Sequence, residues 1–395
     1  MQPNYQTNFQ NLVLLGGGHS HSIVLKLFSR KPIPKVRLTI ITPDRYTPYS
    51  GMLPGHIAGF YSYDECHIDL QSLSKFADVK LYFDQAVGLD LKDNKVLCAN
   101  RTAIDFDLLS IDIGSTPAKL SVSGAAEYAI PAKPVDRLLK HWYELQKNVE
   151  INPQIPISIA IVGGGAGGVE LALSMQSNLQ QILQRHQQPI TNLEVDLFQK
   201  TGELMPNYHP SVRRLMQQVL MEKGVKLHLG ETVSQVAPIV KNKFQIKCES
   251  GLNVAYNRIF WVTQASAPNW VKASGIGTDE EGFILVDDNL QSVTHPHIFA
   301  AGDIATMINH RLPKAGVFAV RQGKPLFKNL QRMILGKSLQ PYKPQKEYLS
   351  LIGTGDGKAI CNRGALILPP HQLIWKWKDC IDRHFMEQFP KLPKT

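Results

Sequence analysis

Residues 159–168 read IAIVGGGAGG, four apolar residues that run directly into a glycine-rich turn. A helical pattern follows the turn, and a second strand-like run, LEVDLF, occupies residues 193–198. This order of strand, turn, helix and strand is typical of the βαβ unit of a doubly wound sheet. In such a turn Gly163 permits the tight bend, Gly165 lets backbone amides approach a pyrophosphate, and Gly168 allows close packing of the helix. The stretch therefore predicts a dinucleotide-binding fold.

The same pattern occurs once more, near the N-terminus. Residues 11–21 read NLVLLGGGHSH, and the β-rich run VRLTII follows at residues 36–41. This copy keeps Gly16 and Gly18 but has His21 in place of the third glycine. One glycine turn is weak evidence, but two copies between a strand and a helix predict two dinucleotide-binding folds. A flavin and a nicotinamide are the chemically useful pair of dinucleotides.

A third segment supports the flavin, and it also helps to divide the chain. Residues 298–303 read IFAAGD, a buried strand whose terminal Gly302 and Asp303 can aim a carboxylate at a ribityl hydroxyl. The proline-containing run at residues 152–156 predicts a linker. We expect an α/β fold with two Rossmann-like domains and a small C-terminal α+β region. The expected boundaries are 1–152 and 285–340 for an FAD-binding domain in two parts, 153–284 for an NAD(P)H-binding domain, and 341–395 for a C-terminal region with an amphipathic helix.

Composition and charge narrow the function. Hydrophobic residues make up 43% and charged residues 19% of the 395 residues, which is typical of a globular protein. The net charge of +10 favours an anionic partner, but the basic residues are scattered, so we expect no nucleic-acid partner. No apolar run approaches the roughly 20 residues that span a bilayer, and the N-terminus lacks a signal peptide's apolar core. Five widely spaced cysteines predict reduced thiols in the cytoplasm rather than a disulfide framework.

With its two glycine turns, the chain resembles the FAD-dependent pyridine nucleotide-disulfide oxidoreductase superfamily, on its type II NADH dehydrogenase side. Four motifs more closely resemble the flavoprotein module that is fused ahead of selenophosphate synthetase in some bacteria. These motifs are GGGHSH at residues 16–21, TPYSGMLP at 47–54, WVT at 261–263 and PKAGVFAVRQG at 313–323. The resemblance runs from about Asn11 to Phe389 and stops before a synthetase domain, so we expect no synthetase activity.

The resemblance implies an FAD site in the first fold. Lys314 and the N-terminus of the helix after Pro313 would stabilise the negative charge of reduced flavin, which makes Lys314 a candidate catalytic residue. Thr42 stands at the end of the second strand, where the family usually has an acid that binds the adenosine ribose. The expected FAD-binding residues are Gly16, Gly18, His19 and Ser20 at the pyrophosphate, Thr42 at the position of the ribose-binding acid, Tyr49, Ser50, Gly51, Met52, Leu53 and Pro54 along the flavin ring, Asp303 at the ribityl chain, and also Gly114, Gly302, Lys314, Ala315 and Gly316.

The second fold would bind NADH or NADPH, and Glu170 would lie close to the nicotinamide as the second candidate catalytic residue. Gln199, followed by Lys200, stands where an acid would select NADH, so both nucleotides remain open as donors. The expected nucleotide-binding residues are Gly163, Gly165, Ala166, Gly167, Gly168 and Gln199.

We therefore expect an FAD-dependent NAD(P)H:acceptor oxidoreductase, with a quinone as the expected acceptor. Type II NADH dehydrogenases carry a glutamine near Val317 that borders the quinone, and this chain lacks it, so the acceptor stays open. One alternative is a sulfide:quinone reductase, although no cysteine pair matches the positions that such enzymes need. Another is a nucleotide-sensing partner of selenophosphate synthetase with little turnover.

Several other motifs favour simple structural roles. We expect no metal at His19 and His21, because no carboxylate or cysteine lies at ligand spacing. Residues 353–358 read GTGDGK, one residue shorter than a phosphate-binding loop, and predict a hairpin turn. Cys361 is expected to be a buried thiol rather than a redox centre.

A C-terminal amphipathic helix is predicted by Ile374, Trp377, Ile381 and Phe385, which recur at helical spacing. We expect this stripe to pack on the protein's own core or in a homodimer. Tryptophan and lysine also suit a membrane interface, so reversible association with the cytoplasmic face of a membrane is the alternative.

Overall fold

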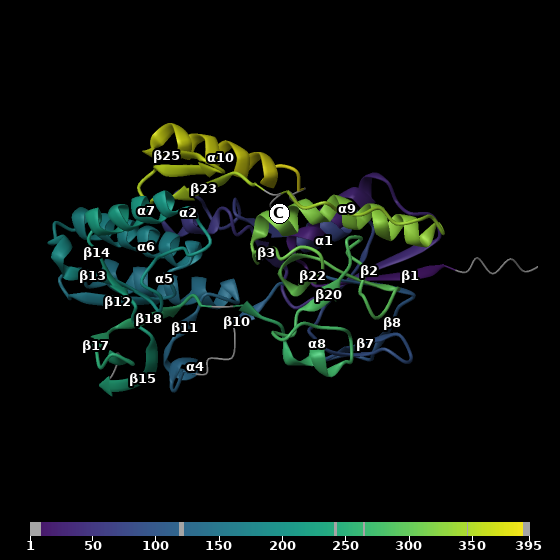
Figure 1. Cartoon of the computed structure of the whole chain (residues 1–395), viewed down its shortest axis with the longest axis horizontal. Helices are drawn as coiled ribbons and strands as arrows, with labels where there is room; N and C mark the ends of the chain where they lie inside the picture. Colours follow the sequence, from purple (N-terminus) through teal and green to yellow (C-terminus); the bar gives the residue numbers. More distant parts are fainter. Residues whose placement is uncertain (1–8, 118–121, 241–242, 264, 346, 390–395) are drawn as a thin grey trace, which may run out of the picture.

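Two lobes lie side by side in the computed structural model, and each contains one parallel sheet and one of the glycine turns (Figure 1). The C-terminal residues form a third, smaller part along one side. This arrangement confirms the expected α/β class with two Rossmann-like folds and a C-terminal α+β region. The structure describes residues 9–117, 122–240, 243–263, 265–345 and 347–389.

The first lobe is built on a five-stranded parallel sheet with β1 at its centre. The side chains of Leu12 to Leu15 in this strand are fully buried, which is typical of parallel strands covered on both faces. Two helices that share this core, α1 (His19–Arg30) and α9 (Gly316–Ile334), lie against each other. The strand order is β21 (Ile298–Ala300), β9 (Leu108–Ile111), β1 (Gln10–Leu15), β2 (Val36–Thr42) and β5 (Lys80–Phe83).

The second lobe repeats this plan. Its glycine turn follows the central strand β12 and leads into α6 (Ala166–Arg185). The strand order is β11 (Ile130–Pro131), β18 (Arg258–Trp261), β12 (Ile157–Val162), β13 (Leu193–Gln199) and β14 (Val225–Leu229). All neighbouring strands are parallel, so the loops after the strands gather at one edge of each sheet.

Smaller elements complete the two lobes. The paired strands are β3 (Tyr46–Pro48) with β4 (His67–Asp69), β6 (Ala86–Asp90) with β7 (Lys95–Cys98) and β8 (Ile104–Asp105), β10 (Thr116–Pro117) with β19 (Ala265–Ser266), β15 (Val233–Val240) with β16 (Lys243–Cys248) and β17 (Asn253–Tyr256), and β20 (Ile284–Val286) with β22 (Ala305–Met307). The helices are α2 (Leu53–Ile57), α3 (Leu70–Phe76), α4 (Ala125–Tyr128), α5 (Val135–Ile151), α7 (Pro210–Glu222) and α8 (Asn269–Ala273), with 3-10 turns η1 (Ile190–Asn192) and η2 (Gly302–Ile304).

The C-terminal module, residues 347–389, consists of an antiparallel sheet and α10 (Gln372–Met386). Its strands are β23 (Ser350–Gly353), β24 (Ala359–Arg363) and β25 (Leu366–His371). Residues 354–358 form the turn between β23 and β24, where Gly353 pairs with Ala359, so the predicted hairpin is confirmed. The module contacts α6 and α7 of the second lobe, and its last residues, including Phe385 and Phe389, join the core of the first lobe.

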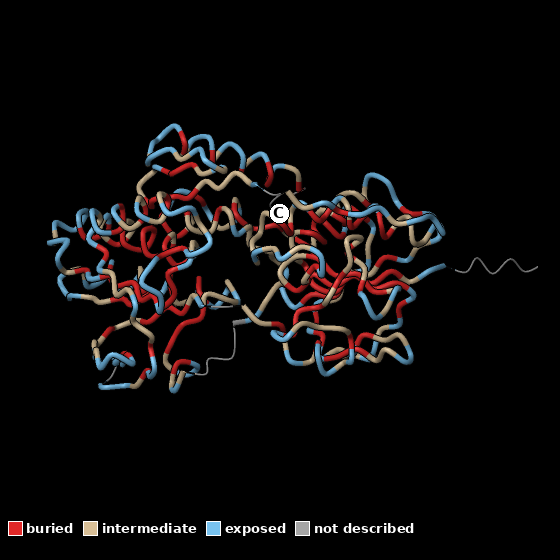
Figure 2. Tube along the Cα trace, in the orientation of Figure 1, coloured by how far each residue is buried: buried red, intermediate tan, exposed pale blue. Residues whose placement is uncertain are grey.

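The expected amphipathic helix exists, but its buried face is not the predicted one. Ile374 and Phe385 are buried, whereas Trp377 and Ile381 are 46% and 41% exposed. The outer side of α10 is drawn largely as exposed in Figure 2. The buried face is turned towards Lys378 and Asp382, a charged pair that no hydrophobic pattern could place inside.

The packing also differs from the expected domain boundaries. Strand β11 pairs with β18, and α5 packs in the second core through Leu138 and Trp142, although both elements precede residue 152. Conversely, Val271 of α8 packs in the core of the first lobe, although it precedes residue 284. We therefore propose that the second domain extends from about residue 122 to residue 263, because Ala125 and Ala129 of α4 also pack with its strands. The predicted linker at residues 152–156 does not separate the domains, because β11 pairs with the distant strand β18.

Candidate functional site

The two glycine turns lie at the carboxyl ends of their sheets and share one geometry. Gly16 and Gly163 both have left-handed φ angles, +94° and +123°, which favour glycine. The amide of Gly16 donates to Ile41 O at 2.8 Å, and the amide of Gly163 donates to Phe198 O at 2.9 Å. Each bond joins the turn to the next strand of its sheet. Both turns therefore stand at the place where doubly wound sheets bind ligands.

In the first turn the glycines are required by the protein itself. A Cβ atom on Gly16 would lie 2.3 Å from Asp112 O, and one on Gly18 would lie 2.3 Å from Asp112 Oδ1. Asp112 follows β9 and is almost fully buried, and its carboxylate accepts a hydrogen bond from the amide of His21 at 3.1 Å. Burial raises the pKa of Asp112 to about 7. No motif marks this acid, which closes the inner side of the turn.

His21 replaces the third glycine without loosening the turn. Its Nδ1 lies 2.7 Å from Gly16 O, and its Nε2 lies 2.8 Å from Ser110 Oγ. Because a carbonyl only accepts, Nδ1 carries the proton and Nε2 accepts from the serine hydroxyl. Burial lowers the pKa of His21 to about 4, so the ring is neutral. In the second turn a Cβ on Gly168 would lie 1.9 Å from Gly163 O. There the helix packs directly against the turn because Gly168 has no side chain.

The start of α1 presents an unsatisfied group that fits a flavin nucleotide. Nε2 of His19 is buried and has no hydrogen-bond partner among the described residues. Its ring lies edge-on to Tyr49, with the centroids 5.6 Å apart. Ser20, expected at the pyrophosphate, instead donates its hydroxyl to Ala319 O at 2.7 Å and joins α1 to α9. A buried orphan nitrogen beside a helix N-terminus suits a phosphate or flavin oxygen.

The loops after β9 and β21 bring the expected ribityl-binding residues together. Gly114 has φ +68°, and a Cβ added there would meet no atom within 4 Å, so this backbone faces open space. Asp303 accepts hydrogen bonds from Ser115 Oγ at 3.4 Å and from Lys133 Nζ at 2.8 Å. Lys133 was missed by the sequence reasoning, because it belongs to no motif and comes from the second lobe.

The segment from Tyr49 to Pro54, expected along the flavin ring, contacts both α9 and α10. A Cβ on Gly316, the first residue of α9, would lie 2.4 Å from Ser50 Oγ, so the start of α9 touches this segment. From the other side Lys378 Nζ donates to Gly51 O at 2.5 Å and is paired with Asp382 at 2.5 Å. Two distant parts of the chain, the start of α9 and α10, thus contact this six-residue segment.

Met52 and Leu53 divide this segment between the two cores, since Met52 packs in the first and Leu53 against the second. Thr42, expected at the adenosine ribose, is buried at the end of β2 and donates to Asp44 O at 3.3 Å. The oxygen of Thr42 also lies beside Gly17 in the first turn. Its position matches the expectation, and its contact with a nucleotide stays a prediction.

Lys314 is held by protein groups on the side of β22. Its Nζ donates to Ala305 O at 2.7 Å and to Thr306 Oγ1 at 2.9 Å, and it lies 3.9 Å from the ring centroid of Phe283. Burial lowers the pKa of Lys314 to about 8. In this conformation the amine is engaged, so its role towards reduced flavin stays a prediction. The N-cap of α9 is Ala315, whose side chain cannot bond to the first amides of the helix. These amides therefore remain as a source of positive potential for reduced flavin.

In the second turn some glycines have free space where a side chain would be, and others do not. A Cβ on Gly165 would meet no atom within 4 Å, and one on Gly167 would touch only Val262 Cγ1, at 3.9 Å. Ala166 is the first residue of α6, directly after this open position. Gln199 supports the turn, because its Oε1 accepts from the amide of Gly164 at 2.9 Å and its Nε2 donates to Thr201 Oγ1. A dinucleotide phosphate can therefore approach at Gly165 without displacing protein atoms.

Glu170, the fifth residue of α6, is covered by the C-terminal module. Its Oε1 accepts from the amide of Gly353 at 2.9 Å, close to the ring of Trp375. Burial raises the pKa of Glu170 to about 7, while the nearby charge of Lys378 lowers it. Its expected place near the nicotinamide stays a prediction, since its carboxylate is already bonded to β23.

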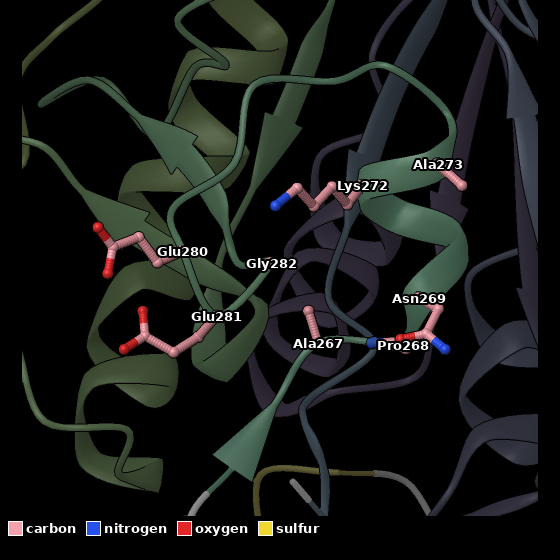
Figure 3. A pocket seen from close by; sticks show the side chains of 8 residues that line it. All are labelled: Ala267, Pro268, Asn269, Lys272, Ala273, Glu280, Glu281 and Gly282. Carbon is pink, nitrogen blue, oxygen red and sulfur yellow. The ribbon is translucent and has the colours of Figure 1, made fainter. Parts of the chain in front are cut away.

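A separate surface pocket of about 380 Å³ lies between α8 and the turn at residues 280–282 (Figure 3). Lys272 and Glu281 give it mixed charge, and none of the predicted cofactor residues lines it. It is therefore distinct from both glycine turns. Within the described part of the chain, no group of three or more His, Cys, Asp or Glu residues could hold a metal ion.

Comparison with known proteins places these motifs in a family. A model described as pyridine nucleotide-disulphide oxidoreductase matches residues 10–323. Ferroptosis suppressor protein 1 of Homo sapiens is 27% identical over 281 residues, which cover 69% of this chain and 68% of that protein. The NADH dehydrogenase-like protein YutJ of Bacillus subtilis is 22% identical over 383 residues, which cover 93% of this chain and 99% of that protein.

Solved structures share the fold. NDH2 from Plasmodium falciparum in complex with NADH has a TM-score of 0.81 at 14% identity, covering 96% of this chain and 97% of that one. The sulfide:quinone oxidoreductase of Aquifex aeolicus has a TM-score of 0.77 at 17% identity, covering 96% and 92%.

The family match spans both glycine turns and the segment that ends at Asp303. It confirms FAD and NADH or NADPH as the cofactors, and a type II NADH dehydrogenase-like flavin oxidoreductase as the kind of protein. The residues present fit these groups, because Gly165 and Gly114 are open and His19 offers a buried nitrogen. The chain belongs to the pyridine nucleotide-disulphide oxidoreductase family.

Proposed function

We propose that this flavin-dependent NAD(P)H oxidoreductase passes its electrons to a quinone. The observation that supports hydride transfer between the two nucleotides is the meeting of the two carboxyl-end edges, where Lys133 of one lobe bonds to Asp303 of the other at 2.8 Å. A nicotinamide held by one turn and a flavin held by the other would face each other across this contact. Bound FAD would accept hydride from the nicotinamide and release electrons to the acceptor.

The chain's own residues would bind and orient these groups. The amides around Gly165 and the N-terminus of α6 would hold the pyrophosphate of NADH or NADPH. The amides at the start of α1, with His19, would hold the pyrophosphate of FAD. Positioning and electrostatics supply the catalysis in such a site, so no acid–base side chain is required at the reacting atoms.

A quinone is supported as acceptor by the surroundings of the flavin segment. The ring of Phe385 lies 4.5 Å from that of Tyr49, and Trp375 lies 4.8 Å from Phe60. Phe385 of α10 thus packs on the segment that would run along the flavin, and Trp375 packs beyond the end of that segment. An apolar aromatic acceptor fits such a wall better than a charged one does. One structural neighbour, the sulfide:quinone oxidoreductase of Aquifex aeolicus, is named for a quinone acceptor.

The acceptor is tested by anaerobic reduction with NADH followed by mixing with a water-soluble ubiquinone analogue. We expect the quinone to reoxidise the flavin of the native protein rapidly. In a Phe385→Ala variant, reduction by NADH should be normal and reoxidation by the quinone should be slower. Leu366→Ala, an exposed change on β25, serves as the matched control. Fast reduction without reoxidation by any quinone would remove the quinone assignment. Negligible reduction by either nucleotide would favour a nucleotide sensor with little turnover.

We also propose reversible association with a membrane surface. Leu373, Trp377 and Ile381, one turn apart on the outer side of α10, are 66%, 46% and 41% exposed, and Lys376 lies beside them. Tryptophan and leucine with a neighbouring lysine suit the interface of an anionic bilayer. No helix among the described residues is long and apolar enough to cross a membrane.

Co-sedimentation with vesicles that contain phosphatidylserine tests this surface. A Leu373→Ser and Trp377→Ser double variant should lose binding that the native chain shows at low salt. Trp375 is unsuitable for this test, because it packs inside against Phe60. Equal sedimentation of the two proteins would contradict the proposal, and a concentration-dependent dimer lost in the variant would assign the stripe to a homodimer.

A further inference from the structure

The contact between Lys133 and Asp303 joins equivalent positions of the two folds. Asp303 follows β21, the edge strand beside β9 in the first sheet, and Lys133 follows β11, the edge strand beside β18 in the second. Strand β9 lies next to β1, and β18 lies next to β12; β1 and β12 are the strands that lead into the two glycine turns. The two side chains therefore extend from the same topological place in two similar folds, and they meet between them.

Lys133 makes a second bond that ties the same edge more firmly. Its Nζ donates to Ser115 Oγ at 2.8 Å as well as to Asp303 Oδ2 at 2.8 Å. Ser115 follows β9, and Asp303 follows β21, so one ammonium joins two adjacent loops of the first sheet to the second lobe. These are the loops that carry Gly114 and Gly302, both expected at the flavin.

The energy of the pair argues against a role in overall stability. The side chain of Lys133 is 45% exposed and that of Asp303 is 15% exposed. Ion pairs with such access to water contribute about 0–1 kcal/mol. The pair instead fixes a position, because the bonds to Ser115 and Asp303 hold the ammonium at one point between the lobes.

The pair also acts on the flavin side of the site. Burial lowers the pKa of His19 to about 4, the charge of Asp303 raises it, and the charge of Lys133 lowers it. Both charges are thus felt at the start of α1, where Nε2 of His19 has no partner among the described residues. The charges that act on His19 are those of Asp303 and Lys133. The charge of Asp303 also acts on Asp112 and Lys314 and raises the pKa of both.

We propose that Lys133 is a positioning residue whose ammonium holds Asp303 and Ser115 so that the nicotinamide-binding lobe is fixed in register on the flavin-binding lobe. This inference rests on the proposed hydride transfer between the two nucleotides. Hydride transfer is sensitive to small displacements, since reacting atoms must lie about 3–3.5 Å apart. Loss of the ammonium would loosen the loops at Ser115 and Asp303 and let the lobes shift, while the nicotinamide-nucleotide site of the second lobe stays intact.

The test compares Lys133→Met and Lys133→Arg with Lys140→Met, an exposed lysine on α5 that serves as the matched control. Stopped-flow reduction by NADH under anaerobic conditions, over a range of NADH concentrations, separates the limiting rate from nucleotide affinity. We expect Lys133→Met to lower the limiting rate at least about tenfold while the apparent Kd for NADH changes by less than about twofold. Lys133→Arg should restore most of the rate, because guanidinium can keep both bonds.

Hydrogen exchange of the FAD-loaded proteins gives a readout that does not depend on turnover. Peptides that cover residues 112–117 and 302–304 should exchange faster in Lys133→Met than in Lys140→Met or the native chain. Unchanged exchange together with an unchanged limiting rate would overturn the inference, and so would a change confined to the Kd for NADH. If the native protein is not reduced by either nucleotide, the proposed function fails, and the exchange comparison alone then decides the role of Lys133.

Discussion

Nδ1 of His21 lies 2.7 Å from the carbonyl oxygen of Gly16, so a histidine closes the turn that a third glycine closes in the second fold. The ring is fully buried and bonded at both nitrogens, which means that its neutral form is built into the folded state. The turn therefore keeps the close approach of helix and strand by hydrogen bonding instead of by the absence of a side chain.

This arrangement predicts a pH-dependent contribution to stability. The folded pKa of His21, about 4, lies below the unfolded value of 6.5, so the unfolded chain takes up the proton first. Stability from the neutral ring is present above pH 6.5 and is lost as the pH falls towards 4. Relative to His21→Gln, the native chain should lose about 2 kcal/mol of unfolding free energy between pH 7 and pH 5. Urea titrations at both pH values measure it, and parallel losses in the two proteins would contradict it.

The open and closed positions of the second turn predict opposite effects of two similar substitutions. Gly165→Val should leave the free energy of unfolding and the flavin content nearly unchanged, because its side chain would enter open space. It should lower kcat/KM for NADH roughly a hundredfold, about 2.7 kcal/mol, by occupying the approach of the phosphates. Gly168→Ala should instead destabilise the fold by about 1–3 kcal/mol, since its Cβ would collide with Gly163 O. Steady-state kinetics with chemical denaturation separate the two, and a Gly165→Val enzyme with native kinetics would show that no phosphate binds there.

The first turn behaves differently. Gly16→Val and Gly18→Val should abolish flavin binding, but through collision with Asp112 rather than with the pyrophosphate. Both variants should therefore also show a lower midpoint of thermal unfolding as apoproteins. A stable, native-like apoprotein that merely fails to bind FAD would contradict this reason.

Nucleotide preference depends on the end of β13. Gln199 is occupied by the amide of Gly164 and by Thr201, and Lys200 is exposed, so no acid repels a 2′-phosphate at this position. We expect flavin reduction by NADPH as well as by NADH, and a shift towards NADH in Gln199→Glu. Stopped-flow reduction with each nucleotide gives the ratio of efficiencies. Negligible reduction of the native enzyme by NADPH would show that a group other than Gln199 excludes the 2′-phosphate.

The buried pair of Lys378 and Asp382 predicts that α10 holds the flavin segment. Asp382→Asn leaves a buried ammonium without its counter-charge and should cost about 3–5 kcal/mol, with a fall in FAD content. Replacing both residues together, by Met and Leu, should cost less stability, because neither partner of the pair is left alone. The double variant should still bind FAD more weakly, since Gly51 O loses its donor. Equal FAD affinity in the native chain and the double variant would remove α10 from this role.

Thiol chemistry should be dispensable. Cys361 is fully buried, and burial raises the pKa of its thiol, which makes a reactive thiolate unfavourable. Cys361→Ser should leave flavin reduction by NADH largely intact. A loss beyond about a hundredfold, or about 2.7 kcal/mol, in a folded variant would support a sulfide-oxidising or disulfide mechanism instead.

The sequence alone predicted the parts of the site that follow from local geometry. Strand, glycine turn and helix are contiguous, so both turns and the strand before Asp303 could be located from their residues. Lys133 could not be found in this way, because its place depends on the pairing of β11 with β18, about 130 residues away. The buried face of α10 was misjudged for the same reason, since Lys378 meets Gly51 across 327 residues. Apolar patterns locate helices, but they do not indicate a charged pair whose partner lies in another lobe.

The central claim is that two facing nucleotide sites carry out hydride transfer from NADH or NADPH to FAD, and the visible spectrum of the protein tests it most directly. The protein should purify with FAD, or take it up, and show the absorption of oxidised flavin. Under anaerobic conditions NADH should bleach this band within the first turnover, whereas Gly165→Val should keep the flavin and bleach far more slowly. A preparation that neither contains nor takes up FAD, or a flavin that stays oxidised with both NADH and NADPH, would contradict the account.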